Sequence, residues 1–334
     1  MSWFYQSHLR NHINKNIYKK PTFSVDFLWK TYQWVVKQQR RLWKTFRWYM
    51  IHGVTIENYT AYSADLHIFL KQLKRDHSLS WWDILFQIGC VDIIDETATQ
   101  VIKTQEHKEK IIQQRTLIES DLHQRYDLRP SWREHMPNAT IVLDTTTQPT
   151  KRILSESGKR YVNKWAKAWL HFVELTTKQD WINYRETRYT LSYDKWFSIM
   201  PQETFLELMH FLKHEKKWTL FAALNDKKEI VSWAVYLFYG KQMIYLYGAT
   251  DRSYGAIGAQ YRLTFEILKR AHEHNRTSLD LLWVAPVWQE HDHHLSWVTR
   301  FKQAFDWKTI SYLWNYDIVF NTLLYKTFKI MKGK

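Results

Sequence analysis

The chain has 334 residues with 45% hydrophobic and 24% charged side chains, a composition typical of globular proteins and a length sufficient for two domains with separate cores. No segment approaches the roughly 18 consecutive apolar residues of a membrane-spanning helix, which argues against an integral membrane protein. The net charge of +15 predicts attraction to polyanions such as RNA, nucleotide phosphates or an anionic membrane surface.

The first fifty residues are strongly basic. They contain ten Lys and Arg against one acidic residue, Asp26, which gives a net charge of +9, and we expect a basic surface there. The opening segment lacks the apolar core and cleavage site of a secretory signal. Cys90 is the single cysteine, so no intrachain disulfide can form. These features indicate a cytoplasmic protein.

The first half of the chain is predicted to contain both strands and helices. Short β-branched and aromatic runs indicate strands, whereas apolar residues at helical spacing or long polar tracts indicate helices. The expected strand segments are 22–51, 83–94 and 136–147, and the expected helices are 63–78 and 98–126. The second helix should end before Pro130, because the residue before proline disfavours the helical conformation.

The second half repeats this mixture after a polar linker near residue 148. Asn225-Asp226 and Gly240-Lys241 are hairpin signals that divide residues 221–251 into three strands. Apolar runs at 279–285 and 312–320 indicate two further strands. The expected helices are 154–168, 202–216, 258–274 and a basic C-terminal helix.

This order of elements predicts an α/β (α+β) protein with two tandem domains, each built on a mixed, mainly antiparallel sheet. We expect a first domain over residues 1–147, joined by the C-terminal helix 321–334, and a second domain over residues 148–320. The architecture is that of the acetyltransferase-like (GNAT-like) fold.

Glycine and tryptophan occur in unusual amounts. Eight Gly in 334 residues is about 2.4%, well below the usual 7%, whereas 19 Trp is about 5.7%. Several Trp stand where a turn or a strand end favours Gly, and we hypothesise that they are Gly encoded by UGA in the organism's own genetic code. The alternative is an aromatic-rich sequence. The positions concerned are Trp43, Trp165, Trp169, Trp233, Trp283, Trp307 and Trp314.

Several segments in the second half resemble the FemABX family in order and spacing. They are IYLYGATDRSY (244–254), LDLLWVAP (279–286), the Phe301-Lys302 pair, Phe305-Asp306-Trp307, YLWNYDIVF (312–320) and Leu324-Tyr325. Upstream, MPNATIVLD is similar to the segment that closes the family's first domain. Placing Gly at the unusual Trp positions other than Trp43 improves the match.

The resemblance implies an aminoacyltransferase that moves an amino acid from aminoacyl-tRNA to the stem-peptide amine of a peptidoglycan precursor. The acceptor is a muramyl-pentapeptide, linked to a nucleotide or to a lipid, and the chemistry needs no cofactor. Lys302 matches the Phe-Lys motif and is expected to stabilise the oxyanion of the tetrahedral state. An ordinary surface lysine is the alternative.

The resemblance also suggests substrate-binding residues. Tyr245 and Tyr247 occupy alternate positions of one strand, so their rings should share a face that is either the precursor site or part of the core. Phe301 belongs to the same motif as Lys302. Basic residues expected to contact precursor phosphates are Lys30, Lys37 and Arg188.

Two other patterns point to different chemistry. His291, Asp292, His293 and His294 are potential metal ligands, but the loop lacks outer ligands at defined spacing, and we expect no metal site. Arg252-x-x-Gly255-x-x-Gly258 resembles the pyrophosphate loop of CoA-dependent acetyltransferases with its spacing displaced by one residue.

Two alternative functions therefore remain. One is a CoA-dependent GNAT N-acyltransferase, because a fold does not select the acyl donor. The other is a noncatalytic basic protein that binds RNA or the inner membrane surface. The basic N-terminal region favours RNA over CoA as a partner, and the net charge is also compatible with peripheral contact at the cytoplasmic membrane face.

Overall fold

The structure is a computed structural model in which the chain forms two compact units. Unit 1 comprises residues 1–139, 286–289 and 310–334, and unit 2 comprises residues 140–285 and 290–309. The residues that the structure describes are 13–17, 22–27, 30–41, 44–52, 55–56, 83–89, 92–93, 105–126, 129–131, 137–166, 170–195, 200–251, 257–286, 289, 292–305, 308–311 and 315–331.

Unit 1 contains a six-stranded sheet of order β1-β2-β3-β5-β15-β7. Its neighbours are antiparallel except for β3 and β5, which run parallel. The strands are β1 (Thr22–Phe27), β2 (Lys30–Arg41), β3 (Lys44–His52), β5 (Asp83–Gly89), β7 (Arg129–Pro130) and β15 (Tyr316–Val319). Unit 1 also contains a π-helix (Ile13–Ile17) and a small ladder of β4 (Thr55–Ile56) and β6 (Asp92–Ile93).

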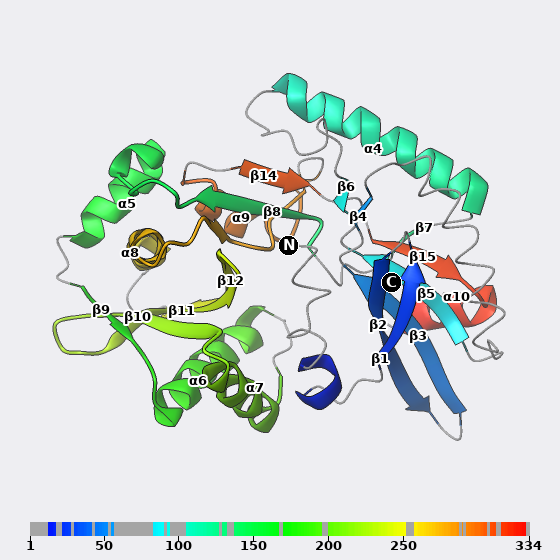
Figure 1. The fold of residues 1–334 in the computed structure, drawn as a ribbon, viewed down its shortest axis with the longest axis horizontal. Helices are drawn as coiled ribbons and strands as arrows, with labels where there is room; N and C mark the ends of the chain where they lie inside the picture. The colour runs from blue at the N-terminus through cyan, green and yellow to red at the C-terminus, as the bar shows by residue number, and fades with distance from the viewer. Residues whose placement is uncertain are drawn as a thin grey trace. The chain divides into compact units, whose positions relative to one another are not determined.

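Two helices complete the described part of unit 1, α4 (Gln105–Tyr126) and α10 (Thr322–Met331). α10 contacts β5 (Figure 1). The buried Tyr325 hydroxyl of α10 donates to the carboxylate of Asp317 on β15 at 2.9 Å. The C-terminal helix is therefore anchored to the sheet by a buried polar contact as well as by packing.

Unit 2 contains a seven-stranded sheet of order β14-β8-β13-β12-β11-β10-β9. β12 and β13 run parallel, and the strand pairs from β9 to β12 are antiparallel, as is the pair of β13 and β8. The strands are β8 (Ala139–Asp144), β9 (His171–Glu174), β10 (Trp218–Leu224), β11 (Ile230–Tyr239), β12 (Gln242–Thr250), β13 (Ser278–Asp280) and β14 (Lys308–Ser311).

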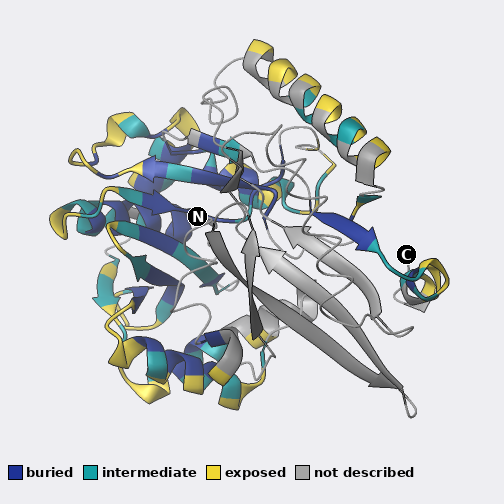
Figure 2. Ribbon diagram, turned by 45° about the vertical axis from the view of Figure 1, so that its right-hand side comes forward, coloured by how far each residue is buried: buried dark blue, intermediate teal, exposed yellow. Residues whose placement is uncertain are grey.

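Helices cover both faces of the unit 2 sheet (Figure 1). α8 (Ile257–Glu273) lies on β10 to β13 and packs against α5 (Glu156–Ala166), whereas α6 (Lys178–Lys195) and α7 (Gln202–His214) pack together on the opposite face. Figure 2 shows buried residues concentrated along these strands and exposed residues on the outer faces of the helices. The core is thus a sheet between two helical layers.

Most of the elements expected in the second half are confirmed. The three strands predicted within 221–251 are β10, β11 and β12, and their turns lie at the two predicted hairpin signals. The expected helices at 202–216 and 258–274 are α7 and α8. The sequence did not predict α6, β9 or β14, and the apolar run at 279–285 is a strand only as far as Asp280. The helix expected at 63–78 lies outside the described residues.

The predicted fold class is confirmed, because both large sheets are mixed and mainly antiparallel. The units, however, divide the chain differently from the expected boundary near residue 148. β8 pairs with β13 in the second sheet, Leu279 standing opposite Leu143, and β15 pairs with β5 in the first sheet. Strand pairing between distant segments decides these memberships. Within the described residues, no helix is both long and apolar enough to cross a membrane.

Candidate active site

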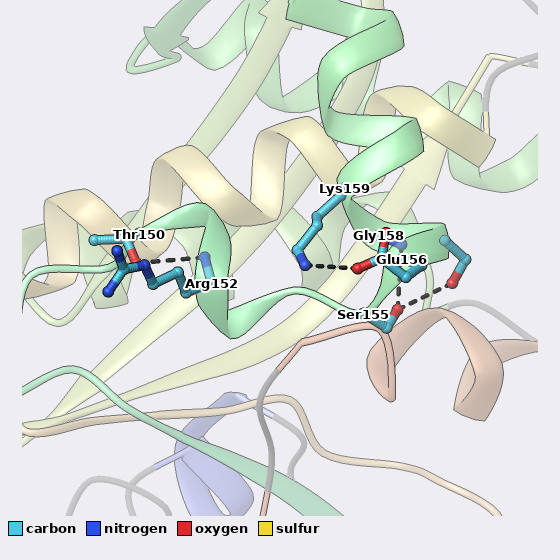
Figure 3. A network of polar contacts seen from close by, with 7 residues as sticks. Thr150, Arg152, Ser155, Glu156, Gly158 and Lys159 are labelled. Carbon is cyan, nitrogen blue, oxygen red and sulfur yellow. Dashed lines mark hydrogen bonds and ion pairs between the residues drawn. The ribbon is translucent and has the colours of Figure 1, made fainter.

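The turn that follows α9 (Ser296–Lys302) is fixed against the start of α5. The Ser155 N–H donates to the Ala304 carbonyl at 2.8 Å. The Ser155 hydroxyl in turn accepts from the Gly158 N–H at 3.2 Å, which caps α5 (Figure 3). A Cβ at Gly158 would lie 2.7 Å from the Ala304 oxygen. This close approach holds the end of α9 in a defined position.

Lys302 lies at that end of α9 and is 2% exposed. Its amine donates to the carbonyls of Leu282 at 2.7 Å and Trp283 at 2.9 Å, and it stands 5.6 Å from the ring centroid of Tyr245. Burial lowers the pKa of Lys302 from 10.5 to about 7, and the negative charge of Asp280 opposes this shift. Lys302 is therefore a buried amine with both charge states accessible near neutral pH, and the surface-lysine alternative is wrong.

Asp280 ends β13 and is 4% exposed. Its carboxylate accepts hydrogen bonds from the Thr140 hydroxyl of β8 and from the Leu282 N–H, the latter at 2.9 Å. Burial raises the pKa of the Asp280 carboxyl, and the Thr140 and Leu282 hydrogen bonds and the charge of Lys302 oppose that shift. A buried carboxylate and a buried amine thus stand on either side of Leu282.

Tyr245 on β12 lies between Lys302 and a polar network from α8. Its hydroxyl accepts from the Gln260 amide at 3.4 Å, and the Gln260 carbonyl accepts from the buried Ser232 hydroxyl at 2.5 Å. A Cβ at Gly248 would lie 1.7 Å from the Tyr245 hydroxyl oxygen. Glycine at this position therefore creates the space in which the phenol lies.

Tyr247 does not share the face of Tyr245, contrary to the expectation from alternation. The β11–β12 register shifts here, so that Tyr245 stands opposite Tyr236 while Tyr247 stands opposite Val235. Because Tyr236 and Val235 are neighbours on one strand, their partners point to opposite faces. The structure brings Tyr245 to Lys302 and leaves Tyr247 on the face covered by α6 and α7.

Phe301 lies in an aromatic cluster and is 9% exposed. Its ring meets that of Tyr261 edge to face at 4.8 Å and that of Phe305 at 6.0 Å between centroids, and Tyr161 stacks on Tyr261 at 4.7 Å. Such packing fixes the backbone of the residue before Lys302. The described geometry of Phe301 is that of a supporting core residue.

The other predicted binding residues lie on different elements. Lys30 and Lys37 belong to β2 of unit 1, and Arg188 belongs to α6 of unit 2. Their side chains lie outside the described part of the structure, so their roles stay predictions. Within the described residues, no group of three or more His, Cys, Asp and Glu side chains is arranged to hold a metal ion.

Two of the unusual tryptophans have described side chains, and their surroundings differ. Trp283 has a φ of +22° and follows Leu282 at +50°, a region that glycine tolerates better than other residues. Trp233 is 4% exposed in β11 and packs against Tyr184 of α6, with ring centroids 5.7 Å apart. Its buried indole N–H has no acceptor among the described residues. The backbone at Trp283 fits the glycine hypothesis, which reading its codon would decide.

Sequence reasoning missed the supporting residues Asp280, Thr140 and Gln260. Asp280 carried a signal, because it interrupts the otherwise apolar run LDLLWVA, and a charged residue inside a buried strand needs a partner. Thr140 and Gln260 carried none, since their importance depends on strand pairing and helix docking.

Comparisons with known proteins find one family profile that matches part of the chain and several structures with a similar fold. A sequence profile of the FemAB family matches residues 202–333, which include Tyr245, Asp280 and Lys302. No curated protein matches the chain. The structure titled crystal structure of FemX has a TM-score of 0.63 at 12% identity, over 97% of this chain and 94% of that one.

Two further structures share less of the geometry. The structure of L-PGS from Bacillus licheniformis has a TM-score of 0.47 at 11% identity, over 94% of this chain and 88% of that one. A GCN5-related N-acetyltransferase from Sphaerobacter thermophilus has a TM-score of 0.46 at 10% identity, over 86% and 76% respectively. These likenesses are too weak to indicate a function.

Proposed function

The FemAB family model matches residues 202–333, and from that match we propose that the chain is an aminoacyltransferase of this family. It moves an amino acid from aminoacyl-tRNA to the stem-peptide amine of a peptidoglycan precursor in the cytoplasm, and so contributes to cross-bridge formation. The observation that carries this proposal is Lys302, a buried amine beside Tyr245 at the position of the family's Phe-Lys motif.

The reaction is an aminolysis of an activated ester. The acceptor nitrogen forms a bond to the ester carbonyl carbon, the carbon–oxygen bond to the terminal ribose breaks, and the amine proton ends on the released hydroxyl. Negative charge develops on the carbonyl oxygen in the tetrahedral state, so a fixed positive group lowers the barrier. Neither an enzyme nucleophile nor a cofactor is required.

Lys302 supplies that positive group in its protonated form. Its amine has three N–H donors, of which two are directed to the carbonyls of Leu282 and Trp283, so one donor is left for an oxyanion. A pKa of about 7 means that the protonated form is present near neutral pH. An oxyanion beside the amine would increase that protonated fraction.

The other predicted site residues have separate proposed roles. Tyr245 forms the wall of the precursor site beside Lys302, and Phe301 supports Lys302 from the aromatic cluster. Lys30, Lys37 and Arg188 are proposed to bind precursor phosphates, because basic side chains form strong charge-assisted bonds with phosphate. Tyr247 is proposed to contact the precursor separately from Tyr245, because it lies on the α6 side of the sheet.

Activity of Lys302 variants tests the reaction. Wild-type protein incubated with labelled aminoacyl-tRNA and muramyl-pentapeptide precursor should form an aminoacylated precursor. Lys302→Met should lower kcat about 10²–10³-fold, the usual cost of removing one oxyanion donor, with the folded structure retained by circular dichroism. Lys227→Met, at an exposed lysine of the turn between β10 and β11, is the matched control. Unchanged transfer by Lys302→Met, or transfer from acetyl-CoA alone, would contradict the proposal.

Peripheral contact with the cytoplasmic membrane face is a further part of the proposed function. α10 exposes Leu323 (67%) and Ile330 (74%), which are seven residues apart and so lie on one side of the helix. Lys326 is exposed close to both, and residues 320–334 contain no acidic side chain. A basic helix with exposed apolar side chains is suited to an anionic bilayer surface.

Vesicle binding tests this contact. Wild-type protein should co-sediment with vesicles containing phosphatidylglycerol more than with neutral phosphatidylcholine vesicles, and less at high salt. Replacing Leu323 and Ile330 with Ser should reduce binding to the anionic vesicles, whereas Leu117→Ser, at an exposed leucine of α4, should not. Equal binding by both variants would assign the contact to another surface.

A further inference from the structure

A buried carboxylate, that of Asp280, and the buried amine of Lys302 both bond to the backbone of Leu282. Asp280 accepts from the Leu282 N–H at 2.9 Å, and Lys302 donates to the Leu282 carbonyl at 2.7 Å. Both side chains are less than 5% exposed, at 4% for Asp280 and 2% for Lys302. Leu282 is therefore held at both its peptide groups by oppositely charged side chains.

The backbone between the two groups has an unusual conformation that these contacts maintain. Leu282 and Trp283 have φ values of +50° and +22°, which non-glycine residues adopt only when their surroundings stabilise them. Both carbonyls that orient the Lys302 amine belong to these two residues. Thr299 of α9 holds the far side of the segment, where its hydroxyl accepts from the Ala285 N–H at 2.7 Å.

The charge environment of Lys302 depends on Asp280. Three phenols lie nearby in the described structure: Tyr245 of β12 stands beside the amine, Tyr236 of β11 packs on Tyr245, and Tyr261 of α8 packs on Phe301. Burial raises the pKa of Tyr236 and Tyr261, so both stay neutral in the working range. Among these groups, only Asp280 can offset the cost of burying the ammonium charge.

We propose that Asp280 is a positioning residue for Lys302: it fixes the Leu282–Trp283 carbonyls that orient the amine, and its negative charge favours the protonated amine. Thr140 supports the same arrangement, because its hydroxyl donates to the Asp280 carboxylate from the neighbouring strand. The catalytic consequence rests on the proposed aminoacyl transfer, but the effect on the charge state of Lys302 does not.

Two measurements on Asp280→Asn separate positioning from mere structural support. In wild type carrying ¹³C-labelled lysine, the Lys302 resonance, identified by its loss in Lys302→Met, should titrate near pH 7. In Asp280→Asn the midpoint should fall by at least one pH unit, because the attractive charge is gone. The amide retains an oxygen that accepts from Leu282.

The kinetic result should follow the same shift. At pH values above both Lys302 midpoints, the ratio of variant to wild-type kcat should be about tenfold lower for each pH unit that separates the midpoints. This ratio should recover at lower pH. Ionisation of the acceptor amine is common to both proteins and cancels in the ratio. KM should change little.

The outcomes distinguish this inference from the proposed function. If the Lys302 midpoint shifts in Asp280→Asn but the wild-type protein has no transferase activity, the proposed function is rejected and the charge coupling is kept. An unshifted midpoint, or an equal loss of kcat at every pH, would overturn the inference. If Asp280→Asn does not fold, Thr140→Val decides: it removes the hydroxyl donor and should lower the midpoint in the same direction by a smaller amount.

Discussion

Replacing Lys302 with methionine should change how the stability of the protein depends on pH. The pKa of Lys302 is about 7 in the folded protein and near its ordinary value of 10.5 in the unfolded chain. Between these values the unfolded state binds more protons than the folded state, so stability rises with pH. From pH 7 to pH 9 the linkage amounts to about 2 kcal/mol in the free energy of unfolding. Methionine does not titrate, and this contribution should vanish in the variant.

Urea unfolding followed by tryptophan fluorescence at pH 7, 8 and 9 measures the effect. The difference between wild type and Lys302→Met should shift by about 2 kcal/mol in favour of wild type as the pH rises. Lys326→Met, at an exposed lysine, should follow the wild-type curve. A constant difference between wild type and Lys302→Met across this range would refute the burial argument, because a lysine that titrates normally gives no linkage below pH 9.

Three further predictions concern packing. Trp283→Gly should lower the free energy of unfolding by less than about 1 kcal/mol, because relief of a left-handed backbone worth about 1–2 kcal/mol offsets the lost contacts. Trp233→Gly should lower it by about 3–5 kcal/mol, because it empties a core site. Equal losses of the two variants in thermal unfolding would contradict this. Gly158→Ala should destabilise the protein by about 1–3 kcal/mol, since its Cβ would clash with the Ala304 carbonyl, and a stabilised variant would argue against that packing. Tyr325→Phe should lower the free energy of unfolding by about 1–3 kcal/mol, because it removes the buried hydroxyl that donates to Asp317, and an unchanged melting temperature would contradict this.

Elements with strong local patterns were predictable from sequence. The three strands of 221–251 follow from apolar runs separated by Asn225-Asp226 and Gly240-Lys241, and a left-handed Gly240 forms the second turn. α7 and α8 follow from apolar residues at helical spacing. α6 was missed because its apolar residues are few and interspersed with polar ones, and its place is decided by packing against α7.

The candidate site was predictable only in part. The resemblance of the Phe301-Lys302 pair to a family motif indicated the proposed catalytic position, but the surroundings of that position depend on distant segments. Tyr245 and Tyr247 illustrate the difficulty: strand alternation predicts a shared face, and a one-residue register shift separates them. Such a shift has no local sequence signal, because it arises from pairing with another strand.

The sequence by itself determined the basic charge, the mixed α/β class and the lysine at the end of a short motif, because composition and local periodicity are properties of neighbouring residues. Tertiary structure alone decided that β8 joins the second sheet and brings Thr140 to Asp280. It also decided that Lys302 is buried, with Asp280 on the other side of Leu282 and with its pKa near neutrality. The physical reason is that desolvation and charge pairing depend on which residues meet in space.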